Sequence, residues 1–289
     1  MTADIVLAAL VGGLLTGGIY ALVALGLTLI YGVLHIVNFA HGSLLMVAMF
    51  IAWLLATRLH IDPYTALPLV TAIMFGIGWL LYRGVIGPVS RNDDTAILLA
   101  TLGVAVVLDN GALVLFTGDT RSIETPWTFS MVELGPLLLS EARVVSFAVA
   151  LALGALLWLF MTRTDTGRAI RAVAREPEGA RLVGIRPARV FALTYGIGTA
   201  CLGAAACLLL PTFYVSPEIG QVFVFVAFTT VVLGGMGSVP GAVLGGLLIG
   251  ITESLGGLFL GESLGPIGIS LVFIAVLLLR PTGLFGAKA

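Results

Sequence analysis

Arginine is the residue type whose clustering first suggests chemistry in this sequence. One polar segment, residues 162–189, holds seven of the 14 basic residues: Arg163, Arg168, Arg171, Arg175, Arg181, Arg186 and Arg189. The uncharged runs on both sides of it are long enough to cross the roughly 30 Å hydrocarbon core of a bilayer. The segment is therefore a loop between two membrane spans. Two interpretations fit its charge: a docking element for a soluble partner, or a loop that only fixes membrane orientation.

Spacing within this segment predicts a short helical hairpin at the cytoplasmic surface. Three arginines, three and four residues apart, share one face of a helix expected over residues 167–175: Arg168, Arg171 and Arg175. Pro177 breaks this helix, and its fixed φ suits the first turn of a second helix over residues 177–183. Gly184 can terminate that second helix.

Other ionisable side chains lie inside or beside apolar runs. His41, Asp109 and Glu253 could form a proton relay, which would indicate a secondary transporter, but structural pairing of each is the favoured interpretation. The scattered histidines and cysteines predict no metal site. Cys201 and Cys207 are six residues apart in one apolar run, so they face different directions and no disulfide is expected.

No nucleotide-binding motif is present. A phosphate-binding loop of the form GxxxxGK[ST] needs a lysine followed by Ser or Thr, and Lys288, the one lysine here, is followed by Ala289. If ATP drives this protein, another chain must bind it. A basic patch interleaved with aromatic residues is also missing, so nucleic acid is not an expected partner.

The elements that position these residues are membrane helices. Hydrophobic residues make up 59% of the chain and charged residues 10%, with a mean hydropathy of +1.14, whereas soluble domains carry about 25% charged residues. Continuous apolar runs exclude a β-barrel. The chain is therefore predicted to be an all-α polytopic membrane protein forming one domain, residues 1–289. Glycines repeated every four residues are expected to let helices pack closely.

The apolar runs predict nine membrane segments, with eight as the alternative. The runs cover residues 5–34, 42–57, 63–82, 95–118, 144–162, 190–217, 219–252 and 263–279. The run over 219–252 would be about 51 Å long as one helix, so it must be broken, near Gly234, Gly235, Gly237 and Pro240. The first run follows no basic residue and is expected to be a retained span rather than a cleaved signal peptide.

Nine segments place the N-terminus outside and the C-terminus in the cytoplasm. The cytoplasmic side then receives eleven basic residues and the outside only three, Arg58, Arg121 and Arg143, as the positive-inside rule requires. The external loop over residues 118–143 contains prolines and a tryptophan and is expected to be an ordered cap.

Two short breaks interrupt the apolar pattern in the two halves of the chain. They are NFAHG at residues 38–42 and GGMGSVPG at residues 234–241. Non-helical backbone at membrane depth is tolerated where it lines a cavity, and paired breaks in two halves indicate a transport route between them. The alternative is that both are tight turns at the cytoplasmic surface.

Four motifs together resemble one known family. NFAHG, GRAIRAVAREPEGARLVGI at residues 167–185, VVLGGMGSVPGAVLGGLLIG at 231–250 and RPTGLFG at 280–286 resemble the permease subunits of ABC importers for branched-chain amino acids, of the LivH type. The motifs occur in the same order over nearly the whole chain. The resemblance implies an ABC importer permease fold with glycine-broken helices, spanning the bacterial inner membrane several times.

The resemblance also implies partners and roles. These are a second, LivM-like permease, two cytoplasmic ATPase subunits that bind the ATP, a periplasmic substrate-binding protein and the surrounding membrane lipid; the chain itself would hold no cofactor. By this resemblance the segment at 162–189 docks the ATPase through Ala172, Glu176, Gly179, Ala180 and Gly184. We expect arginines of the same segment to contribute: Arg168, Arg171, Arg175 and Arg181.

Leucine, isoleucine and valine are the expected substrates, selected mostly by the binding protein. The residues expected to line the route through the membrane are Asn38, Phe39, His41, Gly42, Thr229, Thr230, Gly235 and Ser238. The alternatives are a permease for urea, amides or another amino acid, a passive channel for a small polar solute, and an ion-coupled secondary transporter acting alone. No nucleophile and base pair suggests an enzyme.

Overall fold

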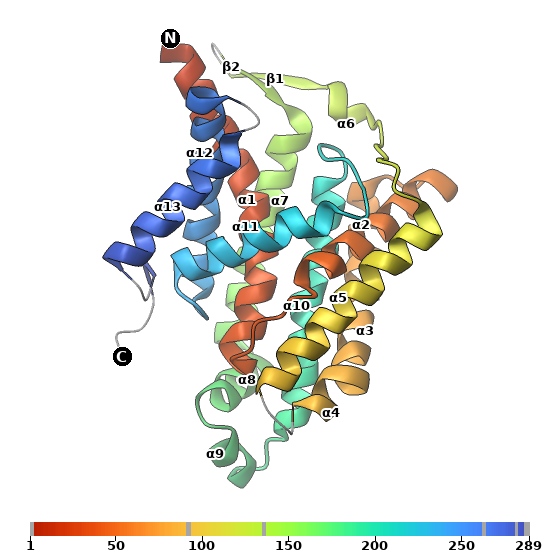
Figure 1. Cartoon of the computed structure of the whole chain (residues 1–289), viewed down its shortest axis with the longest axis vertical. Coiled ribbons are helices and arrows are strands. Elements are labelled where there is room, and N and C mark those ends of the chain that lie inside the picture. Colours follow the sequence, from red (N-terminus) through yellow and green to blue (C-terminus); the bar gives the residue numbers. More distant parts are fainter. Residues whose placement is uncertain (1–2, 91–93, 135–136, 262–263, 281–282, 286–289) are drawn as a thin grey trace.

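The computed structural model describes residues 3–90, 94–134, 137–261, 264–280 and 283–285. Nine apolar helices form the bundle in this part of the chain (Figure 1): α1 (Ala3–Leu34), α2 (His41–Arg58), α3 (Pro63–Leu81), α5 (Asp94–Phe116), α7 (Glu141–Arg163), α10 (Pro187–Leu209), α11 (Ile219–Gly234), α12 (Val239–Leu260) and α13 (Gly265–Leu279). Seven are long and apolar enough to cross a membrane, and α11 and α13 are shorter. The predicted helical membrane bundle is confirmed.

Smaller elements lie at the two ends of the bundle. At one end α3 continues into a π-helical turn, η1 (Tyr82–Ile86), and α4 (Gly87–Val89), beside α8 (Asp165–Arg175) and α9 (Pro177–Leu182). At the other end α6 (Pro126–Phe129) and an antiparallel hairpin of β1 (Met131–Leu134) and β2 (Leu137–Ser140) form the predicted ordered cap. The hairpin pairs Met131 with Ser140, and it is the one sheet within the described residues, beside an isolated antiparallel bridge between Arg121 and Val215.

The arginine-rich end faces the cytoplasm by the positive-inside rule. The start of α1 lies at the opposite end in Figure 1. Backbone N–H groups of Leu284 and Phe285 donate to the carbonyls of Leu233 and Gly234 at 2.8 and 3.1 Å. These bonds satisfy carbonyl groups that the end of α11 would otherwise leave free.

The break predicted in the long seventh run is confirmed. α11 ends at Gly234 and α12 begins at Val239, and Gly235 and Gly237 have φ angles of +97° and +85°. Only glycine adopts such angles without strain. Ser238 then starts α12, because its Oγ accepts a hydrogen bond from the Gly241 N–H at 3.1 Å.

Two halves of the chain repeat the same arrangement in opposite orientation. Each begins with a long central helix, α1 or α10, followed by a non-helical segment and a second helix, α2 or α11. α1 packs along α12 of the other half, and α10 packs along α3 in the corresponding way. Because α1 starts at the external end and α10 at the cytoplasmic end (Figure 1), the halves are inverted, a plan found in many transporters.

Glycines set the spacing between α1 and α12. A Cβ on Gly13 would lie 2.6 Å from the Gly250 carbonyl oxygen, and one on Gly17 would lie 2.8 Å from that of Gly246. Larger residues at these positions would separate α1 from α12. The expectation that glycine repeats serve close helix packing is confirmed for this pair.

Candidate transport pathway and coupling surface

The cytoplasmic segment folds into the two predicted helices, α8 and α9. α8 begins at residue 165 rather than 167, because the Thr164 hydroxyl accepts a hydrogen bond from the Gly167 N–H at 3.0 Å and caps the helix. Ile170 and Val173 are fully buried on the face of α8 that packs against the bundle. The hairpin is therefore anchored to the membrane helices through its apolar face.

The arginines of the hairpin lie on its exposed side. Arg168 forms an exposed ion pair with Asp165 at 3.0 Å. Arg171, Arg175 and Arg181 are exposed, and within the described ranges they have no ion pair. These three guanidinium groups are therefore available to a partner, whereas Arg168 is partly neutralised by its own helix.

The five residues assigned by family resemblance differ in their surroundings. Glu176 is exposed at the junction of α8 and α9, and Gly184, with φ +88°, is exposed where the hairpin ends. Ala180 is buried on the inner side of α9, while Ala172 and Gly179 are half-buried. Ala180 therefore positions α9, and the exposed members of the group form part of its outer surface.

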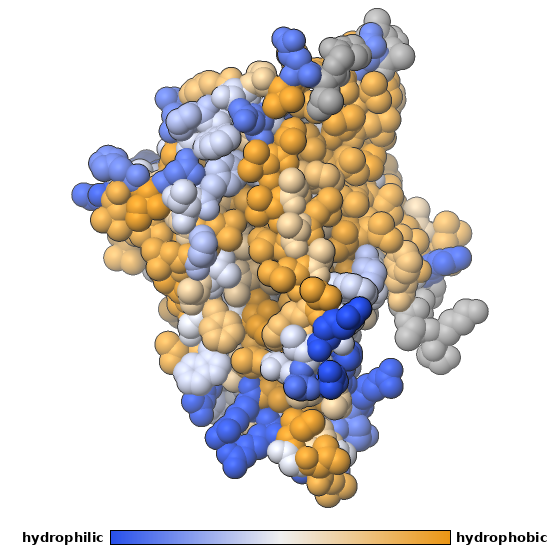
Figure 2. Space-filling view, turned by 180° about the vertical axis from the view of Figure 1, so that it is seen from behind, coloured by the Kyte–Doolittle hydropathy of each residue, from blue (hydrophilic) through white to orange (hydrophobic). Residues whose placement is uncertain are grey.

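An apolar tip on the hairpin was not predicted. Leu182 and Val183 are 90% and 76% exposed, between Arg181 and Gly184. Figure 2 shows this end of the molecule as an apolar projection beyond the hydrophilic residues of the cytoplasmic side. An exposed apolar pair outside the membrane is typical of a protein contact. The signal in the sequence is two apolar residues at the end of an otherwise polar loop.

The first break returns the chain from the cytoplasmic end into the bundle. His41, the first residue of α2, is fully buried, and its Nε2 lies 3.0 Å from the Val23 carbonyl oxygen, to which it donates. Val23 is eleven residues before the end of α1, which places His41 about 16 Å inside that end. The first break is therefore not a surface turn. The Asn38 Oδ1 accepts from the Ala40 N–H at 3.1 Å and fixes the bend.

The start of α2 meets the start of α11. A Cβ on Gly220 would lie 2.7 Å from the Gly42 carbonyl oxygen, so the two helices cross in direct backbone contact. The segment 210–218, which leads from α10 to α11, is therefore the structural counterpart of the first break. It was not predicted, because the apolar run over 190–217 shows no polar interruption until its end.

The second predicted break lies elsewhere. A Cβ on Gly32 would be 3.0 Å from the Gly237 Cα, which places the α11–α12 turn at the cytoplasmic end of α1. α11 separates this turn from Gly220 by about 21 Å at the rise of an α-helix. The structure thus brings NFAHG to the start of α11 and does not bring the two predicted breaks together.

Several residues expected along the route are buried within the chain. Phe39 is 47% exposed and Ser238 is half-buried, whereas the other six are buried: Asn38, His41, Gly42, Thr229, Thr230 and Gly235. Four of these side chains carry a polar atom without a hydrogen-bond partner among the described residues: Asn38 Nδ2, His41 Nδ1, Thr229 Oγ1 and Thr230 Oγ1. A buried polar atom left unpaired costs about 1–3 kcal/mol, and native proteins keep few of them.

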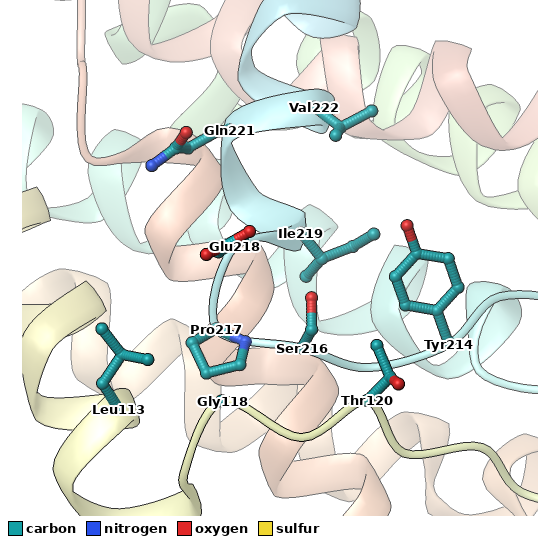
Figure 3. A pocket seen from close by; sticks show the side chains of 10 residues that line it. All are labelled: Leu113, Gly118, Thr120, Tyr214, Ser216, Pro217, Glu218, Ile219, Gln221 and Val222. Carbon is teal, nitrogen blue, oxygen red and sulfur yellow. The ribbon is translucent and has the colours of Figure 1, made fainter. Parts of the chain in front are cut away.

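A pocket of about 330 Å³ opens on the external side beside the start of α11 (Figure 3). Apolar side chains of Leu113, Ile219 and Val222 line it together with Tyr214, Ser216 and other polar residues, including Thr120, Glu218 and Gln221. Ser216 is only 7% exposed, and its hydroxyl points toward the pocket in Figure 3. The signal in the sequence is Ser216 and Glu218 on either side of Pro217, directly before an apolar run.

The ionisable residues within the spans lie in different surroundings. The Glu253 carboxyl interacts with the Tyr20 hydroxyl, and His41 bonds to the α1 backbone. Asp109 is half-buried on α5. Over the described ranges, no three His, Cys, Asp or Glu side chains gather as a metal site would require, and both cysteines are free.

An inverted-repeat helical bundle with non-helical backbone at membrane depth and a cytoplasmic hairpin defines a membrane transport permease. The chain belongs to the family described as "Branched-chain amino acid transport system / permease component", which matches residues 9–280. It is a multi-pass inner-membrane protein.

Two curated relatives and one solved structure show the extent of the similarity. The permease protein BraD of a high-affinity branched-chain amino acid transport system in Pseudomonas aeruginosa is 33% identical, over 96% of this chain and 94% of its own. The corresponding LivH of Escherichia coli is 33% identical, over 95% and 93%. PsaBC from Streptococcus pneumoniae, solved with a Fab, has a TM-score of 0.52 at 14% identity, covering 95% of this chain and 92% of that one, and shares the fold.

Proposed function

We propose that this chain is the permease subunit of an ATP-driven ABC importer whose ATP is hydrolysed by separate subunits. The observation that carries the proposal is the α8–α9 hairpin, which Ile170 and Val173 anchor to the bundle. It exposes the Leu182–Val183 tip and three arginines that have no ion pair among the described residues. Such a surface suits a cytoplasmic ATPase, because apolar residues surrounded by a charged rim are typical of protein interfaces. A second permease, two ATPases and a periplasmic binding protein complete the proposed transporter.

Branched-chain amino acids are the proposed substrates. The names of BraD and LivH support this choice, and so does the external pocket. The Glu218 carboxylate can attract the ammonium group of the zwitterion. The Ser216 hydroxyl and the positive end of the α11 helix dipole suit its carboxylate. Leu113 and Val222 offer apolar surface to the branched side chain.

The proposed route runs from this pocket past the Gly42–Gly220 crossing to the buried polar atoms of Asn38, His41 and Thr229. These residues are closed off in the structure, so passage requires a second conformation in which the helices separate. Unpaired polar atoms would then find partners in water or substrate. The ATPase can drive this change only if it contacts the hairpin differently in its two nucleotide states.

Replacement of Leu182 by Asp tests the docking surface. The charge is placed on a 90% exposed side chain, so folding and insertion should be unaffected, while the apolar contact is lost. We expect co-purification of the ATPase and leucine uptake to fall at least about tenfold, as for loss of an interface anchor. Leu138→Asp, at a 68% exposed leucine on the external hairpin, is the matched control and should leave ATPase binding unchanged. Normal ATPase binding by L182D would reject the assignment.

A further inference from the structure

A second cavity lies on the side of the bundle, between four membrane helices. Its volume is about 340 Å³. α7 contributes one wall through Leu153, Leu156, Leu157 and Phe160, and α10 contributes the floor, which includes Ala200 and Cys201. Leu22 of α1 and Thr71 of α3 complete it. The groove opens outward, since Leu156 on its rim is 60% exposed.

The lining of this groove suits a hydrocarbon chain. Apart from the Thr71 hydroxyl and the Cys201 thiol, every lining side chain is aliphatic or aromatic hydrocarbon. α7 crosses the membrane, so water is scarce at this depth and an open apolar groove is filled by hydrocarbon. From Leu153 to Arg163, α7 covers about 15 Å, close to half of the hydrocarbon thickness. Along α7 the groove therefore extends from Phe160, about 4.5 Å inside Arg163, to Leu153 near the middle of the bilayer.

Arg163 lies at the cytoplasmic end of α7, on the helix face that lines the groove. The groove-lining residues of α7 follow helical spacing, and Arg163, three residues after Phe160, continues that face. Arg163 is exposed and, in the part of the chain described, makes no ion pair. Figure 2 shows hydrophilic residues gathered at the cytoplasmic end of a broad apolar face, over the region of α8.

We propose that the groove binds one acyl chain of an anionic phospholipid from the cytoplasmic leaflet, with the phosphate of its headgroup at Arg163. Because Arg163 is positively charged, the site prefers a lipid with an anionic headgroup. A guanidinium group pairs with phosphate in a bidentate geometry that a zwitterionic headgroup, with its own cation, satisfies less well. This site is independent of the substrate and of the ATPase contact.

Native mass spectrometry of the purified transporter, titrated with phosphatidylglycerol or phosphatidylcholine, tests the headgroup contact. The wild-type protein should retain phosphatidylglycerol about fivefold better, the effect of one basic residue near a membrane surface. Arg163→Gln should bring the ratio close to one. Arg58→Gln, at an exposed arginine on the external end of α2, is the control and should leave the ratio unchanged. An unchanged ratio in R163Q would overturn the proposal.

Filling the groove tests the acyl-chain contact. Ala200→Phe should reduce retention of both lipids, while Ala275→Phe, the same change at an exposed alanine of α13, should not. If A200F fails to fold, a variant with a photo-crosslinking residue at position 156 tests the same contact. After irradiation, we expect this variant to gain the mass of a phospholipid. A cross-link to another polypeptide would show that a subunit covers the groove, and it would contradict the proposal.

Discussion

The contact between Gly42 and Gly220 gives the most specific prediction at the scale of single residues. Gly42→Ala would place a methyl group against the Gly220 carbonyl oxygen and force the starts of α2 and α11 apart. Overpacking of this kind typically costs about 1–3 kcal/mol. We expect a lower Tm in detergent and a loss of uptake.

Gly103→Ala is the matched control for this change. Gly103 is also a glycine within a membrane helix, but a Cβ there would have no atom within 4 Å. Its Tm should be equal to or above that of the wild type, because alanine favours the helix over glycine. Equal stability of G42A and G103A would show that the crossing is looser than the structure indicates.

Residue types identified Asn38, His41 and the threonines of α11 as candidates, but their surroundings could not be read from the sequence. The His41 bond to the Val23 carbonyl joins residues 18 positions apart and depends on where α2 starts. Gly235 was expected to line the route, where a larger side chain would block passage. Its φ of +97° means that any such residue would strain the turn itself, so Gly235 is unsuitable for testing passage alone.

At the scale of elements, the join between α7 and α8 determines how firmly the hairpin is held. A Cβ on Gly167 would lie 2.5 Å from the Phe160 carbonyl oxygen, so Gly167→Ala should lift α8 from the end of α7. We expect trypsin to cut after the hairpin arginines at least about fivefold faster in inside-out vesicles, since overpacking weakens local packing by about 1–3 kcal/mol. ATP hydrolysis should become uncoupled from uptake.

Gly179→Ala provides a comparison within the same hairpin. The nearest atom to its Cβ would be the Glu176 Cγ at 3.1 Å, which is part of a flexible, exposed side chain that can move aside. Cleavage by trypsin should therefore remain close to that of the wild type. If G167A and G179A were cleaved at the same rate, the α7–α8 contact would not be what holds the hairpin.

The elements that local chemistry defines were predictable, and those that tertiary packing defines were not. Prolines, capping residues and glycines marked α8, α9 and the α11–α12 turn within one or two residues. In the sequence, the start of α11 was marked only by the end of an apolar run at Pro217, because the non-helical segment before it is as apolar as a helix. Its conformation depends on contacts with the external cap, such as the Arg121 N–H bond to the Val215 carbonyl at 2.8 Å.

The whole molecule consists of two inverted halves that meet along α1 and α10. Hydropathy predicted nine apolar segments, and the described residues form nine apolar helices, of which seven are long enough to cross a membrane. Their orientation remains a prediction from the distribution of arginines. The pairing of α1 with α12 and of α3 with α10 could not be predicted, since glycine spacing shows that a helix packs closely but not against which partner. Each central helix contacts the other half, so a movement at one end can change the packing at the other.

Reconstitution of the purified chain in liposomes distinguishes a permease driven by separate ATPases from a carrier that acts alone. Leucine uptake is measured with and without the ATPase subunits, the second permease and the binding protein. We expect uptake only when all subunits and ATP are present, and none by the chain alone under any ion gradient. Leucine accumulation by the isolated chain, with or without an ion gradient, would show instead that the chain transports by itself.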